Sequence, residues 1–214
     1  MTTPAIIFDL DGTLLRLDVD IEEVRLRLGA LFAPFGVTRP FRPILARIRG
    51  AAHEAVAGGG NEATLRAAAF AILDEWEVAA ASAARPREGA AATLGALVAR
   101  GVRLGLVTNN GRACLAPALH AAGLDAAWFG ATVTRDDVPA PKPDPAGILR
   151  VAAALGAGDP WYIGDHQSDI DAGRAARVSL PGLRLAALRG GLPGAGGFTG
   201  ADRILDRLDE ALGI

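Results

Sequence analysis

The chain has 214 residues, of which 50% are hydrophobic and 21% are charged, so burying a substantial core presents no difficulty. Its formal net charge is −2 and no basic tract occurs, which argues against nucleic acid and against an anionic membrane surface as partners. The single cysteine, Cys114, excludes an intrachain disulfide and a multi-cysteine metal site.

The first residues do not resemble a signal peptide. The stretch "MTTPAIIFDLDG" lacks a basic segment followed by a long apolar one. A run of about eighteen uninterrupted apolar residues, the minimum for a membrane span, is also absent from the sequence. We therefore expect a cytoplasmic protein without a membrane partner.

The chain begins with a strand and continues with helices. Residues 5–9, "AIIFD", form a short apolar run that ends at a carboxylate, as in a strand buried on both faces. Segment 15–85 reads as all-helical and offers no strand candidate. Within it Asp20 begins a helix in a capping box with Glu23, and the "GGGN" break at 58–61 separates two further helices.

Beyond this segment, strands and helices alternate. Further strands are predicted at 102–107, 127–133, 160–164 and 183–188, helices at 87–100, 112–122, 144–155, 169–176 and 202–212, and a glycine-rich surface loop at 189–197. Such alternation predicts a parallel sheet that is covered by helices on both faces.

The predicted fold class is therefore α/β, a doubly wound, Rossmann-like core with an inserted all-helical domain. The core domain comprises residues 1–14 and 86–214, and the insertion comprises residues 15–85. The insertion follows the first strand, at the edge where such sheets bind ligands. Its position suits a lid over a site.

Four short polar segments follow four of the predicted strands. "DLDGT" follows the first, "TNN" the second, "PKPDP" the third and "GDHQSD" the fourth. Because the carboxyl ends of parallel strands meet at one edge of a sheet, we expect the four segments to converge. Each alone is compatible with an ordinary turn or helix start, but together and in this order they predict a functional site.

Two of these segments carry pairs of acids. Asp9 and Asp11 lie two positions apart, so their side chains point to the same side of an extended segment. Close carboxylates repel one another unless a cation lies between them or one is protonated. Asp165 adds a carboxylate from another strand end, and Asp169 lies one helical turn further on. Such oxygen ligands suit Mg²⁺, which usually keeps waters and a substrate phosphate as further ligands.

The other two segments offer groups that bind phosphate. Lys142 is the only lysine among 22 basic residues, and its compact ammonium differs from the planar guanidinium of arginine. It precedes a helix start at which Asp144 can act as the N-cap and Pro145 as the first helical residue, a place that favours anions. Thr108 supplies a hydroxyl, and the turn that follows it supplies amides.

The four polar segments and their neighbours resemble the motifs of a known family. "FDLDGTLL", "VTNN", "KPDP" and "IGDHQSDIDAGRAA" match, in order, the four motifs of the haloacid dehalogenase superfamily. The whole chain is similar to those members that carry an α-helical cap after the first motif, the phosphoglycolate phosphatase and β-phosphoglucomutase relatives. The resemblance implies a Mg²⁺-dependent phosphomonoester hydrolase that acts on a small phosphorylated metabolite.

The resemblance also implies a role for each motif residue. Asp9 would be the nucleophile that forms an aspartyl-phosphate, and Asp11 would protonate the leaving oxygen and then activate water. Thr108 and Lys142 would hold the phosphoryl oxygens, with help from an amide of the Asn109 turn. The implied Mg²⁺ ligands are the Asp9 and Asp165 carboxylates, the Asp11 main-chain carbonyl and Asp169, the last through water.

Several alternatives follow from the same motifs. A dehalogenase would lack the acid at position 11, and Schiff-base chemistry of the phosphonatase type needs a cap lysine, which segment 15–85 does not contain. A response-regulator receiver does not fit the chain length or the helical insertion. A phosphomutase shares the core and remains an alternative. A non-catalytic phosphate-binding module is less favoured, because all the catalytic residues are present.

Substrate choice is expected to come from the inserted helices. Arg42, Arg47 and Arg49 are candidates to bind an anionic substrate, and Arg47 and Arg49 are preferred, although any one arginine is more often a solvated helix residue. His166 is expected to be a helix-start residue and Cys114 a core residue. The sequence leaves the identity of the metabolite open, and we expect a monomer or a weak homodimer.

Overall fold

The computed structural model describes residues 4–190 and 198–214, so most of the predicted loop at 189–197 lies outside the described residues. The chain divides into two compact units. The core unit consists of Met1–Leu17 and Ala81–Ile214, and the helical unit consists of Asp18–Ala80. The helical unit interrupts the core unit between Leu17 and Ala81, whereas the domain boundaries expected from the sequence lie at 14/15 and 85/86.

The core unit is built on one parallel sheet with the strand order β5-β4-β1-β6-β7-β8. Its strands are β1 (Ala5–Phe8), β4 (Arg103–Val107), β5 (Phe129–Val133), β6 (Trp161–Gly164), β7 (Arg184–Leu188) and β8 (Arg203–Leu205). All four residues of β1 are buried, because this apolar strand lies inside the sheet between β4 and β6. The predicted α/β fold class is confirmed.

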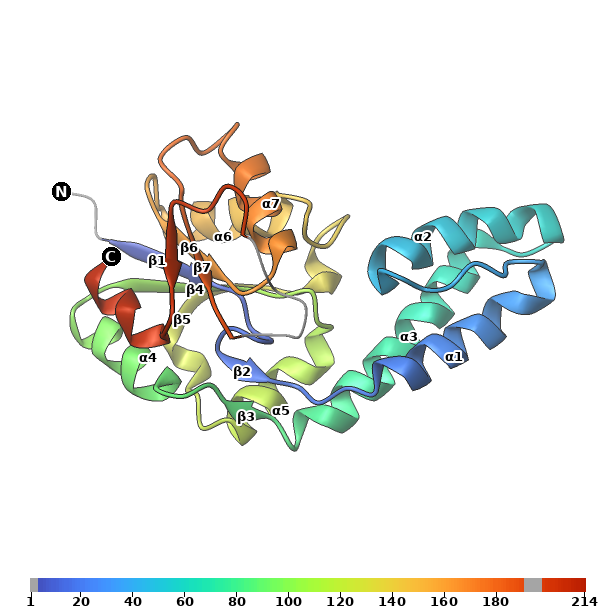
Figure 1. The fold of residues 1–214 in the computed structure, drawn as a ribbon, viewed down its shortest axis with the longest axis horizontal. Coiled ribbons are helices and arrows are strands. Elements are labelled where there is room, and N and C mark those ends of the chain that lie inside the picture. Colours follow the sequence, from blue (N-terminus) through green and yellow to red (C-terminus); the bar gives the residue numbers. More distant parts are fainter. Residues whose placement is uncertain (1–3, 191–197) are drawn as a thin grey trace. The chain divides into compact units, whose positions relative to one another are not determined.

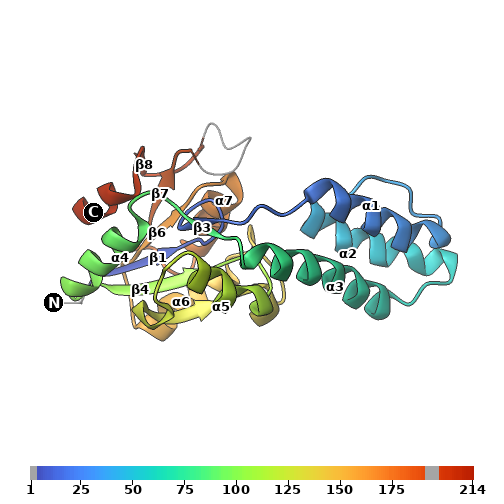
Figure 2. The same cartoon turned by 90° about the horizontal axis from the view of Figure 1, so that it is seen from below.

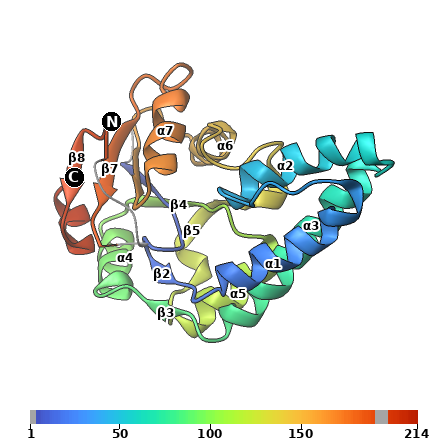
Figure 3. The ribbon, with the colours of Figure 1, turned by 45° about the vertical axis from the view of Figure 1, so that its right-hand side comes forward.

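Helices cover both faces of this sheet. They are α4 (Ala90–Ala99), α5 (Arg112–Ala121), α6 (Ala146–Leu155) and α7 (Gln167–Ala176). Figures 1 and 3 show α6 and α7 on one face of the sheet and α4 and α5 on the other. Ile148 and Val151 of α6 and Ile170 of α7 pack with Ile7 and Leu185 of the sheet in one apolar cluster. The face under α6 and α7 is therefore an apolar core, and the polar residues gather at the strand ends.

Two predictions about secondary structure are wrong. Residues 202–212 were expected to form a helix, but 203–205 form β8, which pairs with β7, and Leu208–Gly213 form a 3₁₀-helix. Pairing at the sheet edge buries Leu205 completely and overrides the local helical pattern. Segment 15–85 is also not all-helical, since β2 (Leu15–Arg16) and β3 (Arg85–Pro86) pair antiparallel at its two ends.

The helical unit contains α1 (Ile21–Phe32), α2 (Ile44–Ala55) and most of α3 (Glu62–Ala81). Figure 2 shows these three helices side by side. Asp20 caps α1 as predicted, because its Oδ1 accepts a hydrogen bond of 3.0 Å from the Glu23 amide. The core of the unit is apolar and includes Leu28, Phe32 and Ile48. Among the described helices of the chain, none is long and apolar enough to cross a bilayer.

Candidate active site

Four strand ends bring polar residues together at the carboxyl edge of the core sheet, which is the convergence predicted from the motifs. Asp9 follows β1, Thr108 follows β4, Asp165 follows β6, and the loop after β5 carries Lys142. These four side chains and that of Asp169 on α7 are all buried, with at most 7% of each residue exposed. Five buried polar groups at one edge need partners, because desolvation is costly.

The Lys142 ammonium lies at the centre of this group. Its Nζ donates to Asp9 Oδ1 at 2.5 Å and to Asp169 Oδ1 at 2.6 Å, and it lies 3.0 Å from the Tyr162 hydroxyl. Burial alone lowers the pKa of Lys142, but the attraction of Asp169 and Asp9 exceeds that effect and raises the pKa well above its ordinary value. Lys142 is therefore charged at neutral pH.

Asp9, Asp165 and Asp169 form a cluster of buried carboxylates. Each offers an oxygen, and these oxygens lie within 4.8 Å of one another. Thr13 Oγ1 lies 3.2 Å from Asp9 Oδ2 and 3.0 Å from Asp165 Oδ1, but a hydroxyl has one proton and can donate to only one of them at a time. Burial raises the pKa of Asp9 well above its ordinary value, Asp169 and Asp165 add to the rise, and Lys142 opposes it.

These residues fit a divalent cation. Three carboxylates face one ammonium, so the ionised cluster keeps an excess of negative charge that a cation would compensate. The donors are hard oxygens, the type that Mg²⁺ prefers. We infer that the cluster can hold a metal ion of this class.

Two glycines let the acids lie against the backbone. Gly12 has φ of +87°, and a Cβ there would lie 2.2 Å from Asp165 Oδ2. A Cβ on Gly164 would lie 2.4 Å from the Asp169 Cβ. Both distances are far below van der Waals contact, so the positions of Asp165 and Asp169 require glycine at these two sites.

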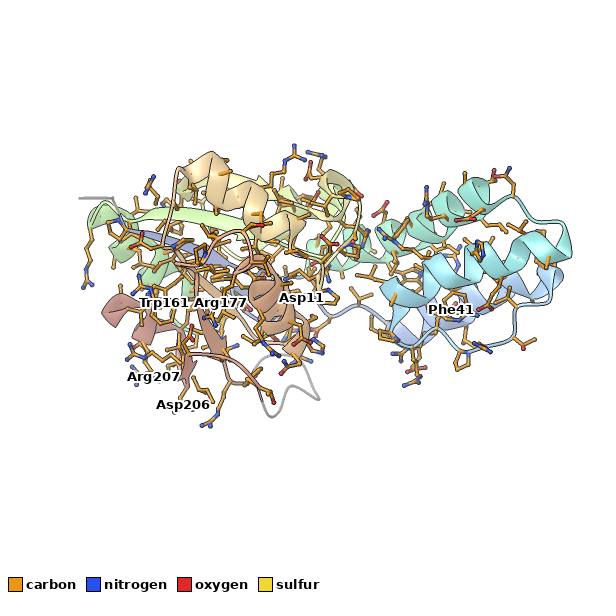
Figure 4. The ribbon with its side chains drawn as sticks, turned by 90° about the horizontal axis from the view of Figure 1, so that it is seen from above. Asp11, Phe41, Trp161, Arg177, Asp206 and Arg207 are labelled. Atoms are coloured by element: carbon orange, nitrogen blue, oxygen red, sulfur yellow. The ribbon has the colours of Figure 1, made fainter. Side chains whose placement is uncertain are left out.

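Asp11 lies outside the three-carboxylate cluster, on the loop after β1 (labelled in Figure 4). It is half-buried, and its Oδ1 accepts a hydrogen bond of 2.8 Å from the Leu17 amide. The loop is held by Arg87, whose guanidinium donates to Gly12 O at 2.6 Å and whose amide donates to Leu14 O at 2.9 Å. Burial lowers the pKa of Arg87, and Asp165 opposes this shift. Asp9 and Asp11 therefore have different surroundings although they are two residues apart.

The turn after β4 is tied to the lysine loop. The Asn109 side chain donates to Lys142 O at 3.1 Å and accepts from the Lys142 amide at 2.8 Å. Thr108 Oγ1 accepts from the Asn110 amide at 3.1 Å, and the buried Arg135 donates to Asn109 O at 3.0 Å. Asn109 thus fixes the main chain of Lys142, a role that the sequence did not indicate.

Arg47 and Arg49 lie on α2 in the helical unit. Arg47 pairs with Glu54 at 2.8 Å, and its guanidinium carbon lies 5.6 Å from the centre of the Phe41 ring (labelled in Figure 4). The Arg47 side chain is only 11% exposed, so it is packed against the helical unit while it pairs with Glu54. Arg49 is exposed, and Arg42 pairs with Glu22 at 2.9 Å.

Sequence reasoning missed Thr13, Tyr162, Arg87 and Arg135 as parts of this site. Thr13 belongs to the quoted "DLDGT" segment, and Tyr162 stands three positions before Asp165, so both could have been suspected. Nothing in the pattern distinguishes Arg87 or Arg135 from the other arginines.

The expectations for two further residues are confirmed. The imidazole Nδ1 of His166 caps α7 by accepting from the Ser168 amide at 3.1 Å, and Cys114 is buried with 1% exposed.

Comparison with known proteins gives a family match over most of the chain. Residues 3–177 match the family described as haloacid dehalogenase-like hydrolase. A stretch of 93 residues is 41% identical to phosphoglycolate phosphatase of Escherichia coli strain K12, and phosphoglycolate phosphatase of Salmonella choleraesuis strain SC-B67 matches equally. These alignments cover 42% of this chain and 36% of each relative, so the match spans little more than a third of their length.

Solved structures share the fold over nearly the whole chain. CbbY from Rhodobacter sphaeroides in complex with phosphate is 24% identical with a TM-score of 0.66, covering 98% of this chain and 96% of that one. A HAD family hydrolase from Deinococcus radiodurans R1 with bound phosphate and sodium is 24% identical with a TM-score of 0.58. The alignment covers 98% of this chain and 93% of that one. At such identities the similarity shows the fold alone.

Proposed function

The chain belongs to the haloacid dehalogenase-like hydrolase family, and from this premise we propose that it is a Mg²⁺-dependent phosphatase of small phosphorylated metabolites. The observation that carries the proposal is the buried pair of Asp9 and Lys142 within the carboxylate cluster. A nucleophilic carboxylate next to a fixed ammonium, at the edge where four strand ends meet, suits phosphoryl transfer, which depends mainly on positioning and charge stabilisation.

In this proposal Asp9 attacks the phosphorus atom and forms an aspartyl-phosphate. The bond to the leaving oxygen breaks, and Asp11 gives that oxygen a proton. Asp11 then takes a proton from water, which attacks the phosphorus and releases inorganic phosphate with Asp9 regenerated. The half-buried position of Asp11, apart from the three-carboxylate cluster, suits a group that must exchange protons.

The remaining residues bind and neutralise. Lys142 and Thr108 hold phosphoryl oxygens, and Asn109 keeps the lysine loop in place through its two hydrogen bonds to the Lys142 main chain. Asp9, Asp165, the Asp11 carbonyl and, through water, Asp169 would hold Mg²⁺. When bound, the ion neutralises charge on the phosphoryl oxygens and the carboxylates.

We further propose that the helical unit, Asp18–Ala80, serves as the cap that selects the substrate, with Arg47 and Arg49 as its anion-binding residues. The partial match to phosphoglycolate phosphatases makes a small phosphorylated acid the first candidate. We expect the enzyme to act as a monomer or weak homodimer in the cytoplasm.

The test is hydrolysis of p-nitrophenyl phosphate, followed by a panel of phosphorylated metabolites that begins with phosphoglycolate. Activity should require Mg²⁺ and disappear with EDTA. Asp9→Asn should lower kcat by at least about 1,000-fold because it removes the nucleophile. Asp125→Asn is the matched control. The exposed Asp125 accepts a hydrogen bond from the Ala127 amide, and asparagine can accept the same bond equally well. An active Asp9→Asn protein would refute the assignment of the nucleophile.

A further inference from the structure

The single lysine and the single tyrosine of this chain hydrogen-bond to each other. The sequence contains seven phenylalanines but only one tyrosine, Tyr162, and its hydroxyl lies 3.0 Å from Lys142 Nζ. The other aromatic residues of the sequence are the phenylalanines and three tryptophans. The size of the aromatic ring therefore does not explain why position 162 carries a hydroxyl.

Tyr162 lies on β6, inside the sheet between β1 and β7, and is completely buried. Its ring belongs to the apolar cluster under α6 and α7, where phenylalanine would pack in the same way. A buried hydroxyl costs free energy unless it forms hydrogen bonds. Here it donates to Asp169 Oδ1 at 2.9 Å and accepts from Lys142 Nζ.

The three groups form a closed triangle, because Lys142 Nζ also lies 2.6 Å from Asp169 Oδ1. A carboxylate can only accept and an ammonium can only donate, whereas a hydroxyl does both. The Tyr162 hydroxyl can therefore bond to both charged neighbours at once.

This triangle also accounts for the three N–H groups of Lys142. One points to Asp9, one to Asp169 and one to Tyr162, with Val107 O further away at 3.4 Å. The lysine stem is flexible, and a residue with so many rotatable bonds holds one position only when its head group is fixed. Without the phenol, the third N–H would face the weaker, more distant carbonyl.

We propose that Tyr162 is a positioning residue that fixes the Lys142 ammonium and the Asp169 carboxylate beside Asp9. Its effect on catalysis rests on the proposed phosphatase function, but its effect on the lysine does not. Tyr162 acts through Lys142 and Asp169 and makes no contact with the reacting atoms in this proposal.

The direct test uses the fact that Lys142 is the only lysine in the sequence. Protein labelled with [¹⁵Nζ]lysine gives a single side-chain NH₃⁺ resonance, which reports on this one group. In the wild type we expect slow hydrogen exchange, because the side chain is only 4% exposed. In Tyr162→Phe the resonance should shift, and its hydrogen exchange should accelerate about tenfold.

The matched control is Ile6→Val on the neighbouring strand. It removes one buried methylene and destabilises the same sheet to a small extent without touching the triangle. Thermal unfolding of both variants shows whether they fold, and Ile6→Val should leave the lysine resonance unchanged. An unchanged resonance and exchange rate in folded Tyr162→Phe would overturn the proposal.

Kinetics provide the second arm. Tyr162→Phe should lower kcat roughly tenfold with a smaller change in KM. If Tyr162 acts through Asp169 and Lys142, Tyr162→Phe should cost much less in an Asp169→Asn background, whereas a purely structural effect would be additive. Full additivity would overturn the catalytic part of the proposal. A wild type without phosphatase activity would refute the proposed function, and the resonance would still decide the role of Tyr162.

Discussion

The core unit and the helical unit differ in how they treat buried polar groups. The carboxyl edge of the core sheet buries Asp9, Lys142, Asp165 and Asp169 together. Among the buried polar and charged side chains of the described residues, Glu77 alone belongs to the helical unit. Several charged residues of that unit form exposed pairs, such as that of Arg27 with Glu75 at 2.9 Å.

This difference indicates where the free energy of each unit comes from. The helical unit is stabilised by apolar packing, and its surface ion pairs contribute little. The core unit places charges where water cannot solvate them, an arrangement that is costly unless every charge is paired. We therefore expect similar substitutions in the two units to have unequal effects.

The largest contrast is expected for exchanges between lysine and arginine. Lys142→Arg should lower kcat roughly 1,000-fold, because a planar guanidinium cannot occupy the compact space between Asp9, Asp169 and Tyr162. Arg27→Lys, an exchange in an exposed pair of the helical unit, should leave kcat and Tm unchanged. Steady-state kinetics and thermal unfolding measure both. Near-normal turnover of Lys142→Arg would show that the site does not require a compact ammonium at position 142.

A smaller contrast separates two glycines with similar positive φ angles. Gly12 has φ of +87° and Gly59 in the helical unit has φ of +84°, but only at Gly12 would a Cβ meet another residue, Asp165. Gly12→Ala and Gly59→Ala should each lose about 1 kcal/mol of stability from the left-handed conformation. Gly12→Ala should also lower kcat roughly 100-fold by displacing Asp165. Equal kinetics in the two variants would contradict the collision inferred at Gly12.

The smallest contrast concerns two carboxylate caps. In the core unit, Asp137 accepts from the Thr134 amide at 2.8 Å and from its hydroxyl at 2.7 Å, and it pairs with Arg112. Burial opposes the shift, but these bonds lower the pKa of Asp137 below its ordinary value. Its stabilising effect is therefore complete above the pKa of the unfolded state, about 4, and is lost as pH falls through the lowered pKa.

Asp137→Asn should cost about 1 kcal/mol at pH 7, and the loss should shrink below pH of about 4. Asp20→Asn in the helical unit should cost almost nothing at either pH, because asparagine caps the exposed start of α1 equally well. Urea unfolding at several pH values measures both differences. A loss for Asp137→Asn that is independent of pH would show that its charge does not contribute.

The sequence predicted β1, β4, β5, β6 and β7, most helices and the convergence of the four motifs, because these depend on local pattern and on the parallel order of strands. It failed for residues 202–212, where pairing with β7 decided the structure. Pairing between distant segments also created β2 and β3. Local periodicity carries no information on such partners.

Within the site, the motif residues could be read from the sequence, but their supports could not. Asn109 was expected to offer an amide to phosphate, and the structure shows its side chain bonded to the main chain of Lys142. The side chain of Tyr162 reaches the site from a strand, and that of Arg135 from the short 3₁₀-helix Arg135–Asp137. Such contacts depend on packing in three dimensions, which no linear spacing encodes.

The short ribbon of β2 and β3 has a consequence for how this protein could change over evolutionary time. Leu15 pairs with Pro86 and Arg16 with Arg85. This pairing holds together the two points at which the chain leaves and re-enters the core unit. The inserted segment between them therefore has fixed ends. For a flexible loop closed in this way, doubling the length costs only about 0.6 kcal/mol of closure entropy. Selection can therefore lengthen, shorten or exchange the inserted helices while the sheet and its carboxylates stay intact.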